Sequence, residues 1–532
     1  MNMKLIQRLS CLTILSILLL SSFSVSGKRV TQPKTTLSTT DLVDFDPLVE
    51  TIQVTVTIKE IRALDDFGKL KEPSFYVKLI INGEEFTSPT WKNSKHITPY
   101  WSTSVVVPKD TEWVQMKIQL WEEKPLLDKI CDISADEQYT TGTNDTDAEI
   151  WYSLKTGHWA YDDWAFYWFE DEFDDENYTS PGYMPFIDPL FFDPSGYGRL
   201  NGCDDGSIYQ NERDCELWFD ITQIDPDGDG IPYWIETNIY NTSPVVNDSL
   251  FDPNGDGIPM SWDFKWGYDP FAYDNHSTID LEHDGLDNYE EYLMSQWGSD
   301  PFRKDLFIEM DQMMAGPNGE PASIFPDGAK ELLYTAYDRQ NVVYHLDDGS
   351  WGDEGGSEMI PFDNQTEMSW GHGSSELMQI YDDYFLHGNE SNWRRGVFHY
   401  GVVIYQCNVA NGNAFGNDRF QVSSNGLEQK AETRILKLFN PFNVRDVVYA
   451  SAYMHESGHT LGFVSPGVDV QTGKYPYQLD WWRWLPYKSV MNYGWMYKMV
   501  DYSDGSRGRH DSDDWSLLDL EFFQRDFPWF HH

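Results

Sequence analysis

Basic residues are scarce in this sequence. Its 532 residues include 38 Lys and Arg against 87 Asp and Glu, which gives a formal net charge of −49. So few positive charges cannot neutralise a phosphate backbone at a useful density, and nucleic acid is therefore not expected as a partner. The excess carboxylate must be either solvated surface, as in a salt-adapted protein, or liganded to cations.

Long apolar runs are absent after Leu20, and nothing later in the chain resembles a membrane helix. Residues 1–27 carry Lys4 and Arg8 ahead of an apolar run from Leu9 to Leu20, which predicts a secretory signal peptide. An uncleaved signal anchor is the alternative, and both predict a secreted or cell-surface protein. Seven Asn-X-Ser/Thr sequons fit a glycosylated, exported surface, at Asn144, Asn177, Asn241, Asn247, Asn275, Asn364 and Asn389.

Cysteine is also rare, with five in the chain. Cys11 lies in the predicted signal peptide. Cys203 and Cys215 bracket a turn-rich polar loop that a disulfide could close. The sequence assigns no partner to Cys131 or Cys407.

The length and the apolar content predict a folded, multidomain protein. At about 150 residues per domain the chain has room for two to four domains, and aromatic residues make up 16% of it, far above a disordered composition. Residues 28–48 are rich in Thr and Ser and predict a flexible leader. Residues 157–220 are acidic and aromatic without a helical or strand period, and we interpret them as an irregular connector.

An antiparallel β-sandwich is predicted for residues 49–156. Segments of strand length alternate or run apolar between Gly, Pro and Asp turns, at 53–59, 75–81, 102–107 and 114–121. The segments Ala63–Gly68, Pro73–Leu79 and Leu120–Glu123 resemble the synaptotagmin-type calcium/lipid-binding sandwich. The resemblance implies contact with a membrane or cell surface and calcium ligands at loop acids, which here are matched by Asp65, Glu72, Glu122 and Asp128. Lys124 stands where that family has another acid, so solvated loop acids are the alternative.

One pattern recurs three times between residues 221 and 301. Oxygen-bearing side chains occupy loop positions 1, 3, 5 and 12 and glycine occupies position 6, which is the spacing of a calcium loop. The first residues are Asp225, Asp252 and Asp280, so the two sequence intervals are 252 − 225 = 27 and 280 − 252 = 28. The predicted ligands are Asp225, Asp227, Asp229 and Glu236, then Asp252, Asn254, Asp256 and Asp263, then Asp280, Glu282, Asp284 and Glu291. The repeats resemble thrombospondin type-3 repeats, which implies a calcium-stabilised stalk.

The last predicted domain, residues 302–532, is α+β. Strands are predicted at 305–310 and 401–405, helices at 326–337 and 446–461, and a closing amphipathic helix at 514–523. The second helix carries His455-Glu456-Ser457-Gly458-His459. Histidines at i and i+4 share one helix face and can bind one zinc ion, with Glu456 placed beside the metal-bound water as general base.

The segment Ser489–Gly494, which contains Met491, follows this motif and resembles the Met-turn of metzincin zinc proteases. The resemblance implies a zinc endopeptidase in which Tyr493 stabilises the oxyanion. The family's third ligand position is occupied here by Ser465, a poor zinc ligand. Asp469 is the nearest oxygen ligand after it, with Asp480 and His510 as fallback candidates.

The sequence therefore predicts a secreted, calcium-stabilised zinc endopeptidase acting on extracellular proteins. A calcium-dependent adhesion protein with a degenerate or structural zinc domain is an alternative from another class. Glu456 argues against it, because a purely structural zinc site needs no general base. A metallohydrolase of non-peptide substrates also remains open.

Overall fold

The computed structural model describes residues 50–65, 67–68, 71–111, 113–134, 146–154, 156–160, 197–203, 213–352, 355–368, 375–463 and 473–525. The predicted signal peptide (1–27), the leader (28–48) and the sequons at Asn144 and Asn177 lie outside these residues. No helix among the residues described is long and apolar enough to cross a membrane.

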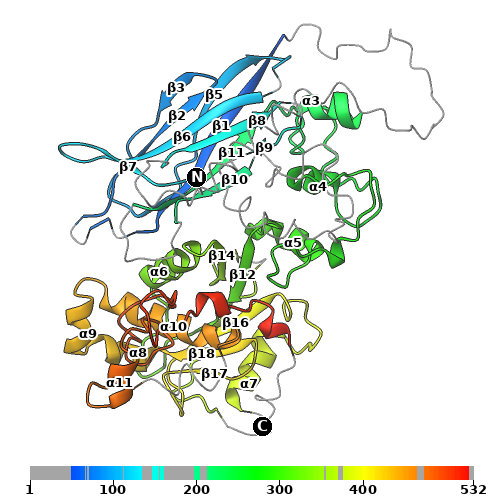
Figure 1. Ribbon diagram of the computed structural model, residues 1–532. Helices are drawn as coiled ribbons and strands as arrows, with labels where there is room; N and C mark the ends of the chain where they lie inside the picture. The colour runs from blue at the N-terminus through cyan, green and yellow to red at the C-terminus, as the bar shows by residue number, and fades with distance from the viewer. Residues whose placement is uncertain are drawn as a thin grey trace. The chain divides into compact units, whose positions relative to one another are not determined.

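Two antiparallel sheets form the N-terminal part, which we call the sandwich (Figure 1). The first sheet has the order β10 (Tyr197–Asn201), β11 (Cys215–Thr222), β1 (Thr51–Ala63), β4 (His96–Ile97), and β5 (Trp101–Pro108) also pairs with β1. The second has the order β3 (Glu84–Thr87), β2 (Phe75–Ile81), β6 (Trp113–Glu122), β8 (Ala148–Ser153), β9 (Trp159–Ala160), and β7 (Lys129–Cys131) also pairs with β6. Burial alternates along β1, β2 and β6, so every second side chain enters one shared core. The predicted strands are confirmed.

The prediction of an irregular connector over 157–220 is wrong for its described strands. β11 pairs with β1 from Thr55–Thr222 to Ala63–Cys215, so a strand far along the chain completes the first sheet. The pattern of a single segment could not show this, because the partner strand lies at the opposite end of the sandwich sequence.

The predicted disulfide between Cys203 and Cys215 is not formed, and the structure joins none of Cys131, Cys203, Cys215 and Cys407, all of which it describes, by a disulfide. β11 turns Cys215 into the sandwich core, where its side chain contacts Cys131.

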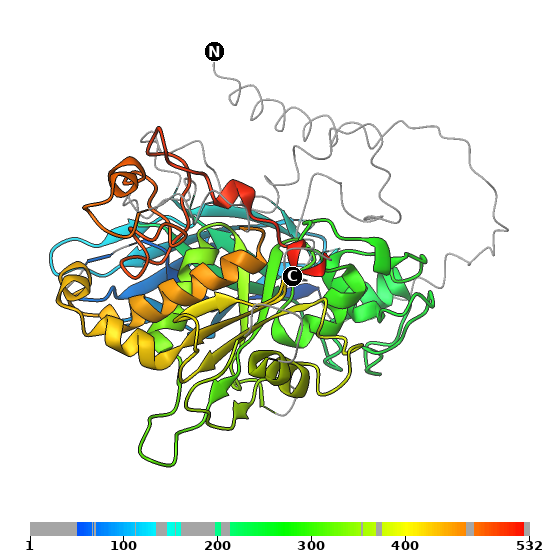
Figure 2. The ribbon, with the colours of Figure 1, turned by 90° about the horizontal axis from the view of Figure 1, so that it is seen from below.

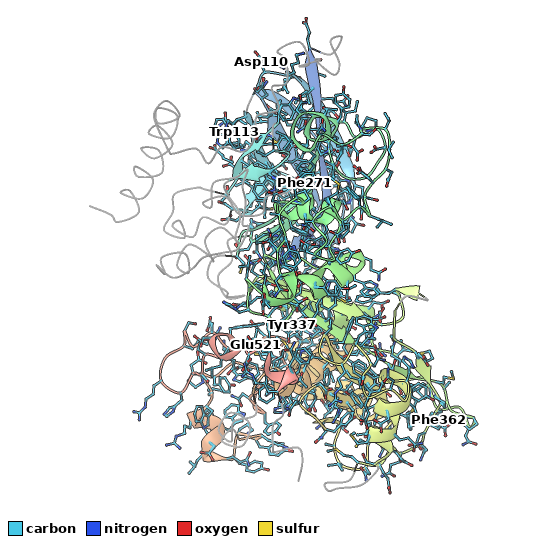
Figure 3. All side chains as sticks on the ribbon, turned by 90° about the vertical axis from the view of Figure 1, so that its right-hand side faces the viewer. Asp110, Trp113, Phe271, Tyr337, Phe362 and Glu521 are labelled. Carbon is cyan, nitrogen blue, oxygen red and sulfur yellow. The ribbon has the colours of Figure 1, made fainter. Side chains whose placement is uncertain are left out.

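Short helices and tight loops form the repeats between residues 223 and 301. The helices are α3 (Tyr233–Ile235), η2 (Glu236–Tyr240), α4 (Met260–Trp266), η3 (His276–Thr278), α5 (Asn288–Met294) and η4 (Ser295–Trp297). Gly230, Gly257 and Gly285, at position 6 of the three loops, all have φ between 92° and 99°, a left-handed conformation that favours glycine. Two small aromatic and aliphatic cores hold the repeats together, and Phe271 lies at their surface (Figure 3).

A mixed, mostly parallel sheet forms the C-terminal domain, for which we use residues 302–525. Its strand order is β14 (Val342–Asp347), β12 (Lys304–Glu309), β16 (Phe398–Ile404), β13 (Gln312–Met313), β15 (Met359–Ile360). β18 (Arg419–Ser423) runs parallel to β16, and β17 (Gly412–Ala414) runs antiparallel to β18. Helix α10 lies along these strands (Figure 2). The helices are α6 (Asp327–Asp338), α7 (Glu376–Ile380), η6 (Tyr381–Phe385), α8 (Ser424–Ala431), α9 (Arg434–Phe439), α10 (Val444–Thr460), α11 (Leu479–Arg483), η7 (Trp515–Leu517) and η8 (Phe522–Gln524).

The two strands and two helices predicted from the sequence of this domain are present, with slightly shifted ends, as β12, β16, α6 and α10. The predicted closing helix over 514–523 is not formed. Its residues make two short 3-10 turns, η7 and η8, because Asp514 instead accepts hydrogen bonds from Tyr487 and from the backbone N–H of Ser503. These bonds tie the segment to the preceding loops.

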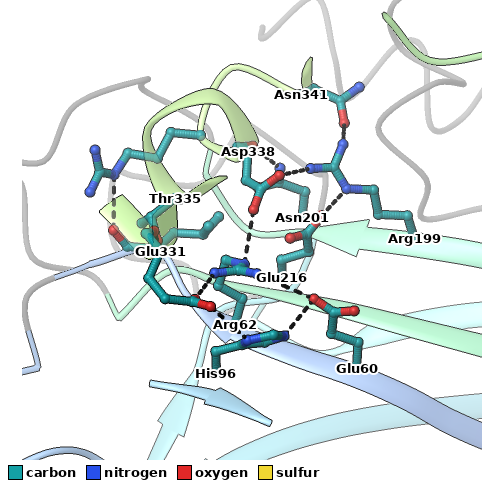
Figure 4. Close-up of polar contacts among 12 residues, drawn as sticks. Glu60, Arg62, His96, Arg199, Asn201, Glu216, Glu331, Thr335, Asp338 and Asn341 are labelled. Carbon is teal, nitrogen blue, oxygen red and sulfur yellow. Dashed lines mark hydrogen bonds and ion pairs between the residues drawn. The ribbon is translucent and has the colours of Figure 1, made fainter. Parts of the chain in front are cut away.

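A buried ion-pair network joins the sandwich to α6 (Figure 4). Arg62 of β1 places Nε 3.0 Å from Asp338 Oδ2 and Nη1 2.5 Å from Glu331 Oε2. Arg199 of β10 is fully buried, pairs with Glu216 and places Nη2 3.1 Å from Asp338 Oδ1. Buried ion pairs offset the cost of desolvating their charges only when their geometry is precise. This network therefore favours a single arrangement of the sandwich against α6.

His96 at the edge of this network makes the contact sensitive to pH. Its Nε2 lies 2.8 Å from Glu60 Oε1 and its Nδ1 3.4 Å from Glu331 Oε1. Burial opposes its charge, but the hydrogen bonds to Glu331 and Glu60 outweigh this and raise the pKa of His96 to about 9.

Because the pKa of His96 is raised in the folded state, its stabilising contribution is complete below about pH 6.5 and is lost as pH rises through 9. We expect the melting temperature of the wild type to fall more steeply between about pH 6.5 and 9.5 than that of His96→Gln. Calorimetry across this range measures the difference. His387→Gln, at an exposed histidine, is the control, and parallel pH profiles for wild type and His96→Gln would contradict the prediction.

Candidate metal centres

The two histidines of α10 are held by backbone carbonyls. His455 Nδ1 lies 2.8 Å from the Val490 carbonyl oxygen and His459 Nδ1 lies 2.8 Å from that of Phe463. A carbonyl oxygen can only accept, so each Nδ1 carries the proton and Nε2 is the metal-binding nitrogen. Ligand atoms of His455, Glu456 and His459 all lie within 4.8 Å of one another. The structure therefore brings these three residues together in an arrangement that suits one metal ion.

Glu456 is buried against the edge strand of the sheet. A Cβ placed on Gly412 of β17 would overlap the carboxylate of Glu456, so the backbone of β17 runs directly beside this group. Tyr497 also lies close to this carboxylate. Burial, and then the charge of Glu456, raise the pKa of Tyr497. No motif in the sequence links Tyr497 to Glu456, so Tyr497 is not among the predicted site residues.

The segment predicted as a Met-turn packs against α10. Met491 is fully buried, and a Cβ on Gly458 of α10 would approach its sulfur to 2.9 Å. The same turn presents the Val490 carbonyl that orients His455. The ring centroids of Tyr493 and His455 lie 5.6 Å apart. Lys474 Nζ lies 4.3 Å from the centroid of the Tyr493 ring. Tyr493 thus lies near the two histidines.

No predicted third zinc ligand is among the described residues grouped with the histidines. Asp469, the preferred candidate, and Ser465 lie outside the described residues. Asp480 is exposed beside Arg483, and the ring of His510 packs against Trp484 at 5.3 Å. Neither fallback residue belongs to the group around His455 and His459 within the described chain.

The first and third calcium loops bring their predicted carboxylates together. Asp225, Asp227 and Asp229 form one group and Asp280, Glu282 and Asp284 another, each with ligand atoms within 4.8 Å. Several inward-facing oxygens are buried without a hydrogen-bond partner among the described residues, including both oxygens of Asp227, Glu282 and Glu291. Buried carboxylate oxygens that no N–H or O–H satisfies are what an oxygen-liganded cation requires. The residues present therefore fit calcium.

Two acids from beyond the predicted loops join these groups. Asp248 lies with Asp229 and Glu236, and Asp305 lies with Asp284 and Glu291. Each follows position 12 of its loop by a similar interval, since 248 − 236 = 12 and 305 − 291 = 14. A calcium-loop pattern ends at position 12, so neither Asp248 nor Asp305 is among the predicted ligands.

The second loop is built differently. Asp263, fully buried, has neither carboxylate oxygen hydrogen-bonded among the described residues. His276 Nε2 lies 3.5 Å from Asp263 Oδ1 and 3.4 Å from Asp256 Oδ2. Asp274 Oδ2 is also buried without a hydrogen-bond partner in the described chain. Asp274 and His276, which precede the third loop, are thus additional residues of this site. Asp252 and Asn254 hold the turn, and Asp252 accepts from the N–H groups of residues 255 and 257.

The raised pKa values of several loop acids show that their charged forms are disfavoured without a cation. Burial, and then neighbouring carboxylates, raise the pKa of Asp229 to about 7, of Glu236 to about 7 and of Asp263 to about 9. Without a cation, charging these groups near neutral pH is opposed by both effects. A bound divalent cation would favour the charged carboxylate form of these groups and so lower their pKa values.

The four predicted acids of the sandwich do not converge in the described residues. Glu122 pairs with Lys124 and with Arg213, and Asp65 accepts from the N–H of Arg213 at 2.8 Å. Asp128 accepts from Lys124 N–H at 2.9 Å, and Glu72 is exposed. Lys124, which replaces an acid of the resembled family, supplies the charge that calcium would otherwise supply. None of the described groups with ligand atoms within 4.8 Å contains these four acids, and calcium binding by the sandwich stays a prediction.

Comparison with protein-family models gives no match, and comparison with curated protein sequences gives none. Among solved structures, human GIVD cytosolic phospholipase A2 is similar at 15% identity and a TM-score of 0.17, over 32% of this chain and 17% of that protein. A C2 domain is similar at 11% identity and a TM-score of 0.17, over 32% of this chain and 97% of that domain. A domain of plant extended synaptotagmin 1 shows 7% identity and a TM-score of 0.17, over 32% of this chain and 93% of that domain. The N-terminal antiparallel sheets thus weakly resemble C2 domains, and scores this low assign no function.

Withdrawing calcium with a chelator, while zinc is kept buffered, should lower the melting temperature and open residues 225–291 to proteolysis. A ligand that binds only the folded state at 100 times its Kd adds about 2.7 kcal/mol per site. Glu236→Gln should weaken calcium binding at one site and reduce this calcium-dependent stabilisation. Glu390→Gln, at an exposed glutamate, should leave it intact. Equal melting temperatures with and without calcium would show that the loops bind none.

Proposed function

We propose that this protein is a secreted or cell-surface zinc endopeptidase that is stabilised by calcium and hydrolyses peptide bonds of extracellular proteins. The observation that carries the proposal is the arrangement on α10, where two carbonyl-oriented histidines flank the buried carboxylate of Glu456. A structural metal site would use further ligands in place of a general base. The unsatisfied carboxylates of the repeats support the calcium part.

His455 and His459 would hold the zinc ion through Nε2, with Asp469 as the proposed third ligand. Zinc, when bound, acts as a Lewis acid and lowers the pKa of a coordinated water toward about 7. Glu456 accepts a proton from the attacking water and returns it to the leaving amine. Tyr493, whose ring lies 5.6 Å from that of His455, would donate a hydrogen bond to the carbonyl oxygen as negative charge develops there.

The edge strand β17 offers a place for an extended substrate. Among the described strands, β17 pairs only with β18, so its other edge carries backbone groups that a peptide can pair with. Gly412 on this strand lies against Glu456. A peptide bound along β17 would therefore have its backbone beside the general base, which favours a peptide substrate over a compact small molecule.

Contact with a membrane or cell surface through the sandwich is part of the proposal. Leu126 and Leu127, in the turn between β6 and β7, are 100% and 79% exposed, so two large apolar side chains project together. A Leu126→Ser, Leu127→Ser variant should lose the co-sedimentation with anionic phospholipid vesicles that we expect of the wild type. Equal co-sedimentation of variant and wild type would contradict it.

Glu456→Gln should retain zinc and the fold but lose about 10²- to 10⁴-fold in peptide hydrolysis, because the amide cannot accept the water's proton. Metal analysis and cleavage of an unstructured protein measure the two effects. His455→Ala should instead lose the zinc itself. Unchanged hydrolysis by Glu456→Gln would identify a different base, and absence of hydrolysis by zinc-loaded wild type would favour the adhesion-protein alternative.

Gly412→Ala should reduce activity by up to about 10²-fold, because the added Cβ must displace the Glu456 carboxylate from its position. Zinc content and melting temperature should change little. Gly416→Ala, where the new Cβ meets only the flexible side chain of Arg419, is the matched control. Full activity in Gly412→Ala would show that β17 does not restrain the glutamate.

A further inference from the structure

The third calcium loop is not closed by the repeat alone. Asp284 and Glu291 of the loop have ligand atoms within 4.8 Å of Asp305, and all three residues are buried. Asp305 is the second residue of β12, a strand in the interior of the C-terminal sheet that pairs with both β14 and β16. One candidate cation site thus takes its ligands from two parts of the chain.

The carboxylates at this place lack the partners that would make their burial favourable. Glu282 and Glu291 are buried, and none of their four carboxylate oxygens has a hydrogen-bond partner in the described chain. Burial and the neighbouring acids raise the pKa of both well above the usual value. A loop that formed only a tight turn would not be expected to bury two carboxylates without hydrogen-bond partners beside another acid, Asp284.

Asp305 also connects the loop to a second strand. Its Oδ1 lies 2.6 Å from Nε2 of His345 on β14, and its backbone N–H donates to Asp284 Oδ2 at 2.6 Å. The ring of His345 stacks on Phe307 of β12, with centroids 4.2 Å apart. Any change in the position of Asp305 is therefore transmitted to β12 and β14 together.

We propose that calcium bound in the third loop is shared between the repeat and β12, and that it fixes the start of β12 and, through His345, the middle of β14 in the C-terminal sheet. Calcium occupancy at this site then determines the local stability of the domain that carries α10, in addition to the stability of the repeats. The proposal deepens the proposed calcium stabilisation and does not depend on peptidase activity.

Hydrogen–deuterium exchange of the full chain tests this, with zinc buffered and with either saturating calcium chloride or a calcium chelator. In the wild type, calcium should slow exchange in residues 304–309 and 342–347. Asp305→Asn keeps an oxygen for His345 but removes the charge, and it should lose this calcium-dependent protection together with one calcium per chain. Asp248→Asn, the matched change at the first site, should lose one calcium but keep the protection of β12 and β14.

Two results would overturn the proposal. One is exchange in β12 and β14 of the wild type that does not depend on calcium, while residues 225–240 respond to it. The other is Asp305→Asn with unchanged calcium stoichiometry and protection. If Asp305→Asn does not fold, Glu291→Gln alters the same site from α5 and should show the same losses. Absence of any calcium binding by the wild type would instead refute the calcium assignment of the repeats as a whole.

Discussion

The repulsion among buried carboxylates in the repeats is the constraint on which much of this structure depends. The loops place several acids within 4.8 Å of one another and leave many of their oxygens without hydrogen bonds in the described chain. Uncompensated buried charge of this kind costs several kcal/mol per ion. A bound cation would convert the same groups from a destabilising set into a link between successive repeats, and the proposed calcium sites would account for part of the −49 net charge.

The candidate metal site on α10 differs from the loops, because backbone groups set the geometry of its histidines. The carbonyls of Val490 and Phe463 fix the tautomer and orientation of the two histidines before any metal binds. Met491 and Gly458 determine how closely the turn approaches α10. A side chain larger than glycine at position 458 would separate the turn from the helix and remove the Val490 carbonyl from His455.

Local patterns in the sequence predicted local structure well. The helix with His455 and His459, the three loops and the first strands of the sandwich each depend on short-range spacing, and all are present. The failures involve long-range partners. Strand β11 is recognised only from its pairing with β1, and the place of Cys215 only from its contact with Cys131. The acidic groups of the repeats likewise include Asp248 and Asp305, which lie outside the loop patterns. No periodicity in one segment records which distant segment will pack against it.

Two of the connections between the C-terminal domain and the rest of the described chain respond to different conditions, alongside apolar packing of Leu286 and Met294 against the C-terminal core. The contact of Arg62 and Arg199 with Asp338 joins the sandwich to the end of α6 through buried ion pairs. The third loop contacts β12 through carboxylates that could share a cation. When one connection has formed, the flexible chain between the two parts of the other connection is shorter. The loss of chain entropy on forming the second connection is therefore smaller. Loss of calcium would remove only one of the two, and the domain would then remain attached to the sandwich while β12 and β14 become easier to open. Local loosening, and not separation of the domains, is the response that this arrangement favours.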